Sequence, residues 1–274
     1  MNGQRDFLKE ICDEQGIKIE SFSQDYVLRL SKNGITCHIF GAFWEINNAA
    51  ADRIAGDKNA CSLILANNGI PVIHHELFFN PKQRLNWATS EGSWTAALAY
   101  FNSTGRSAVL KPNQGTLGND VYYCDSIPLM EAAVQTIFTS HPSCAISPYV
   151  DIKTEYRVFY NNGECPFIYG KQPAENEWQH NLSKGARAVV LPNETEEDKN
   201  KINDLKILAV KAAKCIGITF ATVDIVEDIK GEYKIMEINA GVQARILLQQ
   251  HPHLRPIIKK MYTNAVHEMF RGKE

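Results

Sequence analysis

The sequence lacks the short motifs that mark the commonest nucleotide-binding and covalent-catalysis sites. Its 274 residues contain no GxxxxGK(S/T) loop and no GxGxxG fingerprint, which excludes a Walker P-loop and a Rossmann-type dinucleotide site. The seven cysteines include no CxxC pair, and no Ser-His-Asp or Cys-His arrangement has local support for nucleophilic catalysis. We therefore expect buried free thiols and a chemistry that needs no nucleophilic side chain.

Strong charge and long apolar runs are missing as well. The formal net charge of −2 gives no general attraction to nucleic acid or to an anionic membrane. No apolar run approaches the roughly 20 residues that a membrane span needs, and the first residues have no signal-peptide core. With 44% hydrophobic and 22% charged residues, the composition predicts a cytoplasmic protein that binds neither nucleic acid nor membrane.

Helical and extended patterns follow one another in groups along the chain. Strands are expected at 26–30, 35–40, 71–78, 107–111, 119–124, 144–150, 155–161 and 164–171. Helices are expected at 5–15, 47–68 with a break near Gly56, 90–101, 128–139, 195–216 and 253–270. Adjacent strands with helices between the groups indicate α+β layers rather than one alternating parallel sheet.

An acidic hairpin at residues 222–239 is the most informative segment. Apolar and polar residues alternate on both sides of Asp228-Ile-Lys-Gly231, which predicts two strands joined by a tight turn. That turn brings Asp224 close to Glu237, and Asn239 points to the same face as Glu237. Two carboxylates and an amide oxygen suit Mg²⁺. The alternative is a solvated hairpin with a polar open face, and the hairpin alone does not decide.

A lysine precedes a glycine-bearing turn in the segment 109–121. An apolar strand ends at Lys111, and Gly115 and Gly118 follow before the next strand. Glycines let backbone N–H groups approach an anion closely, and a nearby ammonium adds positive charge. The segment therefore suits phosphate binding, although a hairpin with a long turn would give the same pattern.

Two further polar segments lie between this turn and the acidic hairpin. Glu155 and Arg157 alternate onto one face of a strand, where a carboxylate could accept both hydroxyls of a ribose and a guanidinium could clamp phosphate. Lys171, His180 and Asn181 belong to a polar, irregular stretch at 171–187, and binding residues often lie in such loops. Taken separately, these segments could equally be an edge strand and a solvated loop.

The order of these segments resembles the ATP-grasp superfamily. A lysine before a glycine loop, a Glu-x-Arg strand, an Asn-bearing loop and an Asp…Glu-x-Asn hairpin follow one another, and Asp57-Lys58 and Gly69-Ile-Pro-Val72 resemble the start of that family's ATP-binding unit. The likeness covers roughly residues 52–270 and is to carboxylate–amine ligases. These include glutathione synthetase, cyanophycin synthetase, the ribosomal-protein glutamate ligases and D-alanine–D-alanine ligase.

The resemblance implies an ATP-grasp fold of the α+β class, in which two α+β subdomains clamp ATP. A short N-terminal α/β segment would span 1–56 and the ATP-grasp domain 57–274. The ATP-grasp domain would comprise a linker and helical part, a small ATP-clamping subdomain and a metal-binding subdomain, at 57–105, 106–150 and 151–274.

The resemblance also implies a role for each candidate residue. The ATP phosphates would be contacted by two lysines and a closing loop: Lys58, Lys111, Gly115, Thr116 and Gly118. The adenine would lie against the backbone of Ser147, Tyr149 and Val150. Two Mg²⁺ ions, or Mn²⁺ in their place, would be held by Asp224, Glu237 and Asn239. Glu155 would bind the ribose, Arg157 would face the reacting phosphate, and Asn181 would lie on the acceptor or phosphate side.

The implied reaction is an ATP- and Mg²⁺-dependent ligation in two steps. A substrate carboxylate attacks the γ-phosphate to give an acyl-phosphate, and an amine then displaces phosphate to give an amide. Such phosphoryl transfer needs positioning and charge neutralisation more than covalent help from the protein. Two alternatives remain: an ATP-grasp kinase that stops at a phosphorylated product, and a non-catalytic nucleotide-binding protein.

The substrates implied are a carboxylate and an amine, each a small molecule or a peptide. Arg245, shortly after the metal-binding strand, is a candidate clamp for a substrate carboxylate. Only about 50 residues precede Asp57, too few for a full doubly wound domain. The substrate pocket is therefore expected to be open, to be completed by a second subunit of a homodimer, or to suit a large acceptor such as a peptide or a carrier protein.

Overall fold

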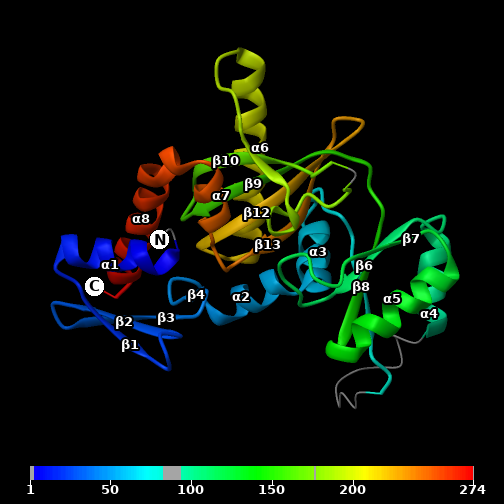
Figure 1. Cartoon of the computed structure of the whole chain (residues 1–274), viewed down its shortest axis with the longest axis horizontal. Helices are drawn as coiled ribbons and strands as arrows, with labels where there is room; N and C mark the ends of the chain where they lie inside the picture. Colours follow the sequence, from blue (N-terminus) through cyan, green and yellow to red (C-terminus); the bar gives the residue numbers. More distant parts are fainter. Residues whose placement is uncertain (1–2, 83–93, 176, 274) are drawn as a thin grey trace.

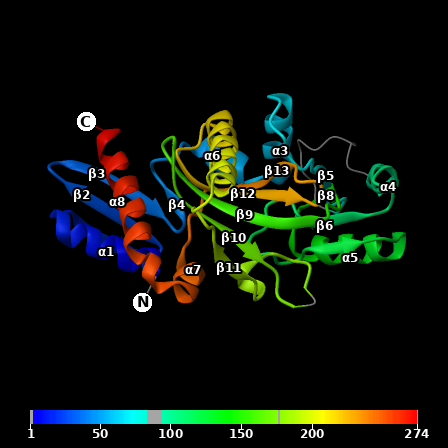
Figure 2. The same cartoon turned by 90° about the horizontal axis from the view of Figure 1, so that it is seen from above.

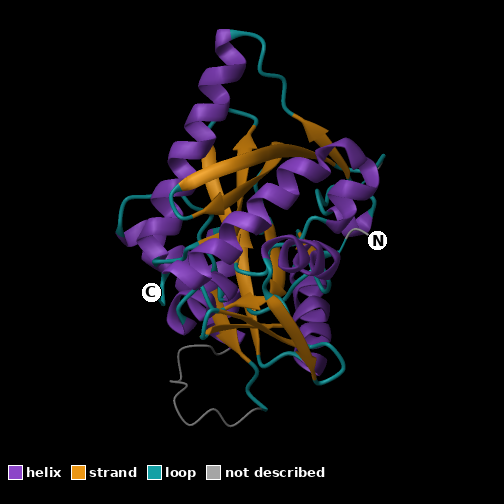
Figure 3. Ribbon diagram, turned by 90° about the vertical axis from the view of Figure 1, so that its left-hand side faces the viewer, coloured by secondary structure: helices purple, strands orange, loops and turns teal. Residues whose placement is uncertain are grey.

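The computed structural model describes residues 3–82, 94–175 and 177–273. Within these ranges the chain forms three antiparallel sheets that follow one another along the molecule (Figure 1, Figure 2). Helices cover the faces of the sheets (Figure 3), as the α+β prediction requires. Among the helices that the structure describes, none is long and apolar enough to cross a membrane.

The first sheet, at one end of the molecule, has the strand order β1-β2-β3-β4. Its strands are Lys18–Phe22, Val27–Lys32, Ile35–Phe40 and Phe43–Trp44. Helix α1 (Gln4–Gln15) and the last helix, α8 (Arg255–Arg271), share one core with it, in which Phe7, Trp44 and Tyr262 are buried. Both termini lie at this end (Figure 1). The N-terminal segment is therefore packed against the C-terminal helix.

The central sheet has the strand order β11-β10-β9-β12-β13. Its strands are, in chain order, β9 Ile152–Asn161, β10 Glu164–Gln172, β11 Arg187–Val190, β12 Phe220–Asp228 and β13 Tyr233–Asn239. Helix α6 (Glu196–Ile216) packs its apolar side on this sheet, with Leu205 and Ala209 buried against Val158 and Val223. Helices α2 (Ala49–Gly56) and α3 (Lys58–Asn67) join the same core.

The third sheet, at the other end of the molecule, has the strand order β5-β8-β6-β7. Its strands are, in chain order, β5 Glu76–Phe79, β6 Ala108–Pro112, β7 Tyr122–Cys124 and β8 Ser143–Pro148. Helices α4 (Trp94–Ser103) and α5 (Ile127–Ser140) cover it and bury Phe101, Met130 and Ile137. The chain passes from β8 directly into β9, so the third and central sheets are joined at residues 149–151.

Most of the expected elements are present, and the break near Gly56 is confirmed. Helix α2 ends at Gly56, and Asp57 caps α3 by accepting a hydrogen bond from the backbone N–H of Ala60 (2.9 Å). All seven cysteines are free; six are buried, and Cys215 is half-buried. The start of the helix expected at 90–101 lies outside the described residues.

Several expected boundaries were wrong, and three elements were missed. The strand expected at 71–78 begins only at Glu76, and Val72 makes an isolated bridge to Ile235. The strand expected at 119–124 begins at Tyr122, because Asp120 has a positive φ of 54° that breaks the extended pattern. The elements that the sequence did not predict are short or peripheral: β1, β11 and helix α7 (Arg245–Gln250).

Candidate active site

A cleft of about 650 Å³ lies where the third sheet, the central sheet and the N-terminal segment meet. Every candidate residue from the sequence lines this cleft except Arg245. Arg245 is exposed at the start of α7, so its role as a carboxylate clamp stays a prediction. The cleft has three parts, which we call the nucleotide wall, the charged floor and the substrate end.

The nucleotide wall is formed by two buried lysines and the loop at residues 115–119. The Nζ of Lys58 donates to the backbone carbonyl of Gly115 (3.0 Å), and α3 is further tied to this region because Asn59 N–H donates to Oδ1 of Asn113 (3.0 Å). Burial lowers the pKa of Lys111 to about 8; Lys58 acts in the same direction, whereas Glu237 opposes it. A bound anion would relieve the repulsion between these two ammonium groups.

The loop of the nucleotide wall is fastened to the central sheet by a second loop. The Oγ of Ser183 donates to the carbonyl of Leu117 and to Oδ1 of Asn181, both at 2.9 Å. Gly118 has a positive φ of 67°, and a Cβ built there would lie 2.6 Å from Nδ2 of Asn181. Glycine is therefore required by backbone conformation and by space. The sequence had identified Gly118 and Asn181, but not Ser183 as the residue between them.

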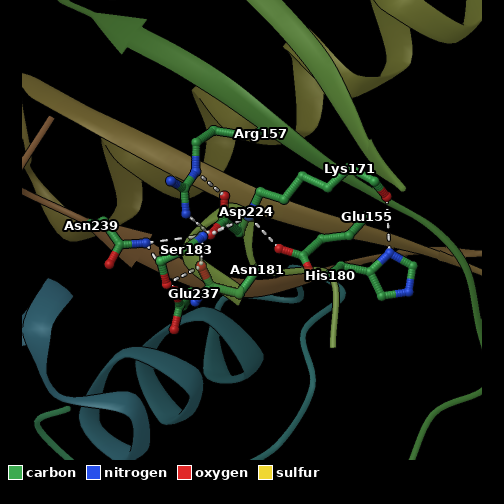
Figure 4. Close-up of polar contacts among 9 residues, drawn as sticks. All are labelled: Glu155, Arg157, Lys171, His180, Asn181, Ser183, Asp224, Glu237 and Asn239. Atoms are coloured by element: carbon green, nitrogen blue, oxygen red, sulfur yellow. Dashed lines mark hydrogen bonds and ion pairs between the residues drawn. The ribbon is translucent and has the colours of Figure 1, made fainter. Parts of the chain in front are cut away.

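The charged floor centres on the carboxylate of Asp224, which is 1% exposed on β12 (Figure 4). Arg157 on β9 binds it with both prongs, Nε to Oδ1 at 2.7 Å and Nη2 to Oδ2 at 2.5 Å. Lys171 on β10 approaches Oδ2 at 3.1 Å and also donates to the buried carboxylate of Glu155. Two cations and two carboxylates thus form one buried network on three neighbouring strands.

Electrostatics hold this network in its ionised form. Burial opposes ionisation of Asp224, but Arg157 and Lys171 outweigh it and hold the pKa of that carboxyl well below its usual range. Burial raises the pKa of Glu155, and Lys171 offsets part of the rise. The sequence assigned Glu155 to the ribose; its carboxylate is bound by Lys171 in this structure, and the ribose role stays a prediction.

The structure brings Asp224, Glu237 and Asn239 together, as the hairpin pattern predicted. Asp224 is paired with Glu237 across strands β12 and β13, and the Nδ2 of Asn239 donates to Oε1 of Glu237 (3.0 Å) and Oδ2 of Asp224 (3.5 Å). The sequence did not predict that Arg157 and Lys171 would both bind Asp224. Glu237 and Asn239 are half-buried, and their oxygens are the ones most open to a cation.

Aromatic rings surround the far end of the nucleotide wall. Tyr149, just after β8, lies 4.8 Å from Tyr123 between ring centroids, and Trp178 lies 6.4 Å from Tyr149. The backbone N–H of Tyr149 is used by the carbonyl of Ser107 (2.9 Å). Flat, partly exposed rings of this kind suit stacking against a planar base. The sequence had pointed to Ser147, Tyr149 and Val150 here, but gave no signal for Tyr123 or Trp178.

The substrate end is formed by the N-terminal segment and by the loop after β13. Ala42, Phe43 and Asp52 line it from one side, and Gly241 and Gln243 line it from the other. A Cβ at Gly241 would lie 3.0 Å from the Cβ of Ala42, so the two sides are in close contact. The expectation that the short N-terminal segment leaves the pocket open was therefore incomplete, because this segment supplies one wall of the cleft.

Comparison with known proteins agrees with this arrangement. A family model for an ATP-grasp domain, family 3 of its clade, matches residues 67–247, which is more than half of the chain. The chain belongs to this ATP-grasp family. Its fold is confirmed by solved structures: D-alanine–D-alanine ligase from Bacillus anthracis aligns with 83% of this chain and 71% of its own, at a TM-score of 0.64 and 16% identity.

Among curated relatives of this ATP-grasp chain are ligases from archaea. The α-aminoadipate–LysW ligase LysX of Saccharolobus solfataricus is 28% identical over 156 residues, covering 53% of this chain and 51% of LysX. The tetrahydromethanopterin:α-L-glutamate ligase of Methanosarcina acetivorans is 25% identical over 246 residues, covering 83% and 66%. The chain thus spans about half to two thirds of the length of these relatives.

Proposed function

We propose that this chain is an ATP- and Mg²⁺-dependent carboxylate–amine ligase that forms an amide bond and releases ADP and phosphate. One observation carries the proposal. Lys58, Lys111 and the Gly115–Gly118 loop lie on one cleft together with the Arg157–Asp224 pair. The relatives named above are all ligases, which favours amide formation over the kinase alternative.

The residues of the cleft fit ATP and Mg²⁺. The two lysines and the backbone N–H groups of the loop would bind the phosphates, and the rings of Tyr123, Tyr149 and Trp178 would cover the base. Mg²⁺ would be held chiefly by the oxygens of Glu237 and Asn239, beside Asp224. When bound, the metal would neutralise charge on the reacting phosphate.

The charged floor positions the groups that the reaction needs. Asp224 holds both prongs of Arg157, which fixes the guanidinium plane toward the cleft without using the rest of its donors. Arg157 would bind the phosphoryl group as it moves from ATP to the substrate carboxylate. Lys171 keeps Asp224 and Glu155 ionised and in place. Such fixed charges lower the barrier because they need no reorganisation during the reaction.

The reaction class is tested by a phosphate-release screen. Purified protein is incubated with ATP, Mg²⁺ and pooled carboxylates and amines, beginning with L-glutamate because two groups of relatives are named for it. We expect phosphate and ADP only when an acid and an amine are both present, with an amide product in the mass spectrum. A phosphorylated product without an amide would establish the kinase alternative instead.

Two variants make the screen specific to this cleft. Glu237→Gln should abolish phosphate release, because it removes a carboxylate from the metal-binding oxygens. The matched control is Glu131→Gln on the exposed side of α5, which makes the same chemical change far from the cleft and should leave the activity unchanged. Equal activity in the wild type and in Glu237→Gln would contradict the proposal.

A further inference from the structure

Asp52 is a carboxylate whose hydrogen-bonding capacity is unused at the substrate end of the cleft. In the described ranges, four buried side chains have polar atoms without a hydrogen-bond partner: Trp44, Asp52, His75 and Asn161. Of these four, only Asp52 lines the cleft. The other three lie outside it and are explained by packing, whereas Asp52 is placed where a substrate could supply the missing partner.

The surroundings of Asp52 leave it without a counter-ion. It is half-buried on α2, and in the part of the chain that the structure describes it forms no ion pair; its Oδ1 is fully buried. Burial raises the pKa of its carboxyl, while Asn47 and Arg53 act in the opposite direction. The Asn47 amide is itself used to hold the start of β12, since its Nδ2 donates to the carbonyl of Phe220 (2.8 Å).

A buried carboxylate without a partner costs stability, so folding alone does not favour it. Nothing in the packing of α2 needs a charge at this position: Ala51 and Ala55 carry the buried face of the helix. Residues that weaken the free protein but lie in a binding cleft are expected where function has selected them. The missing partner must be a donor, and a cation would compensate the charge best.

The geometry points to the ammonium group of the amine substrate: we propose that Asp52 binds the protonated amino group of that substrate at the substrate end of the cleft. This inference rests on the proposed ligase function, which requires an amine near the charged floor. Asp52 lies outside the segment that matches the family model, so this subsite is specific to the N-terminal segment of this chain. Phe43 and Gln243 would contact the remainder of the same molecule.

The inference predicts a selectivity for charge rather than for shape. Amino acids and peptides carry a protonated amino group near neutral pH. A hydroxyl in its place has the same size but no charge, and it leaves the carboxylate uncompensated. Replacing Asp52 by asparagine keeps the side-chain volume and removes the charge, so Asp52→Asn should bind the two classes equally weakly.

The test is a binding titration in the presence of Mg²⁺ and a non-hydrolysable ATP analogue. The probes are the amides of the twenty amino acids, which carry the ammonium group but no carboxylate, and lactamide as an uncharged counterpart of alaninamide. We expect at least one amide to bind the wild type and to bind Asp52→Asn roughly 10- to 100-fold more weakly. The affinity for the ATP analogue should not change.

Two readouts separate this role from a structural one. Asp52→Asn should melt at or above the wild-type temperature, because an unpartnered buried charge has been removed. The matched control, Asp13→Asn on the exposed side of α1, should bind amides as the wild type does. A clear loss of stability in Asp52→Asn would show that the carboxylate serves the fold and would overturn the inference.

The outcomes also distinguish this inference from the proposed function. If the wild type binds the ATP analogue but no amino-acid amide, or if Asp52→Asn binds the amides as tightly, the role of Asp52 is wrong and the ligase proposal stands. If the wild type fails to bind the ATP analogue with Mg²⁺, the proposed function fails first, and the Asp52 inference fails with it.

Discussion

The charged floor and the substrate end of the same cleft satisfy their charges in opposite ways. On the floor, Asp224 is bound by Arg157 and Lys171, and every carboxylate there has a partner within the protein. At the substrate end, Asp52 has a buried oxygen without one. A paired network holds its geometry before any ligand arrives, whereas an unpaired group is completed by a ligand. The floor is built for positioning and the substrate end for recognition.

The largest effect should follow from breaking the floor. Asp224→Asn removes the charge that two buried cations share, leaving Arg157 and Lys171 uncompensated. We expect a loss of about 3–5 kcal/mol in the free energy of unfolding, measured by urea denaturation, together with loss of activity. Glu232→Gln is the control, because its ion pair with Lys234 is exposed and should contribute less than about 1 kcal/mol. Similar losses in both variants would show that the network is not special.

Removing Lys111 should affect the nucleotide more than the fold. Lys111→Met keeps a long side chain and removes a buried ammonium, so ATP affinity should fall roughly 10- to 100-fold while stability is retained. Calorimetric titration with ATP and Mg²⁺ measures this change. An ATP affinity that stays at the wild-type value would place the phosphates away from the nucleotide wall.

The pH dependence of Lys111 gives a separate prediction. Its pKa in the folded protein is lowered to about 8, so the ammonium is present at pH 7 and is lost as the pH rises through 8. ATP affinity should therefore fall between pH 7 and 9 in the wild type, and this component should be absent from Lys111→Met. Between the folded pKa and the higher unfolded pKa, the unfolded chain binds more protons, so the Lys111 contribution to stability becomes less unfavourable as pH rises.

A smaller effect is expected where the loop of the nucleotide wall meets Asn181. Gly118→Ala places a Cβ against the Asn181 amide and should raise the KM for ATP roughly tenfold by displacing the loop. Gly105→Ala is a matched control, since Gly105 has nearly the same positive φ but open space around its Cβ position. Both variants carry the backbone strain, so only the difference between them reports the contact. Equal KM values would remove Asn181 as a support of the loop.

The smallest effect concerns the aromatic rings that would cover the base. Trp178→Ala should weaken ATP binding roughly 2- to 10-fold, because it removes one stacking surface and leaves the phosphate contacts intact. Trp94→Ala is the control, since Trp94 has almost the same exposure (40% against 39%) and lies on α4 outside the cleft. Equal effects of the two substitutions would argue that Trp178 does not touch the base.

The sequence predicted the charged floor in part because local rules govern it. The turn at Asp228–Gly231 sets the pairing of Asp224 with Glu237, and the alternation along β13 then places Asn239 on the same face. The partners of Asp224 depend on the pairing of β9 with β10 and β12, which is set by long-range packing. Lys171 therefore appeared only as a polar residue next to an irregular loop.

The substrate end was beyond the sequence for a different reason. Asp52 reads as an ordinary charged residue in the first turn of a helix, where acidic side chains are favoured. Its burial results from the packing of α2 against β13, together with a sheet that shares its core with the last helix. No local pattern encodes such a contact. The same holds for Trp178, which meets Tyr149 only after the two sheets come together.

The account depends most on the claim that a substrate carboxylate is activated by phosphorylation. It is tested by supplying ATP, Mg²⁺, an amine pool and amino acids with both carboxylate oxygens replaced by ¹⁸O. The carboxylate oxygen that attacks the γ-phosphate leaves with the phosphate when the amine displaces it. We predict that mass spectrometry will find released phosphate carrying one ¹⁸O atom, formed together with the amide. Released phosphate without ¹⁸O, or an amide formed without ATP cleavage, would contradict the account.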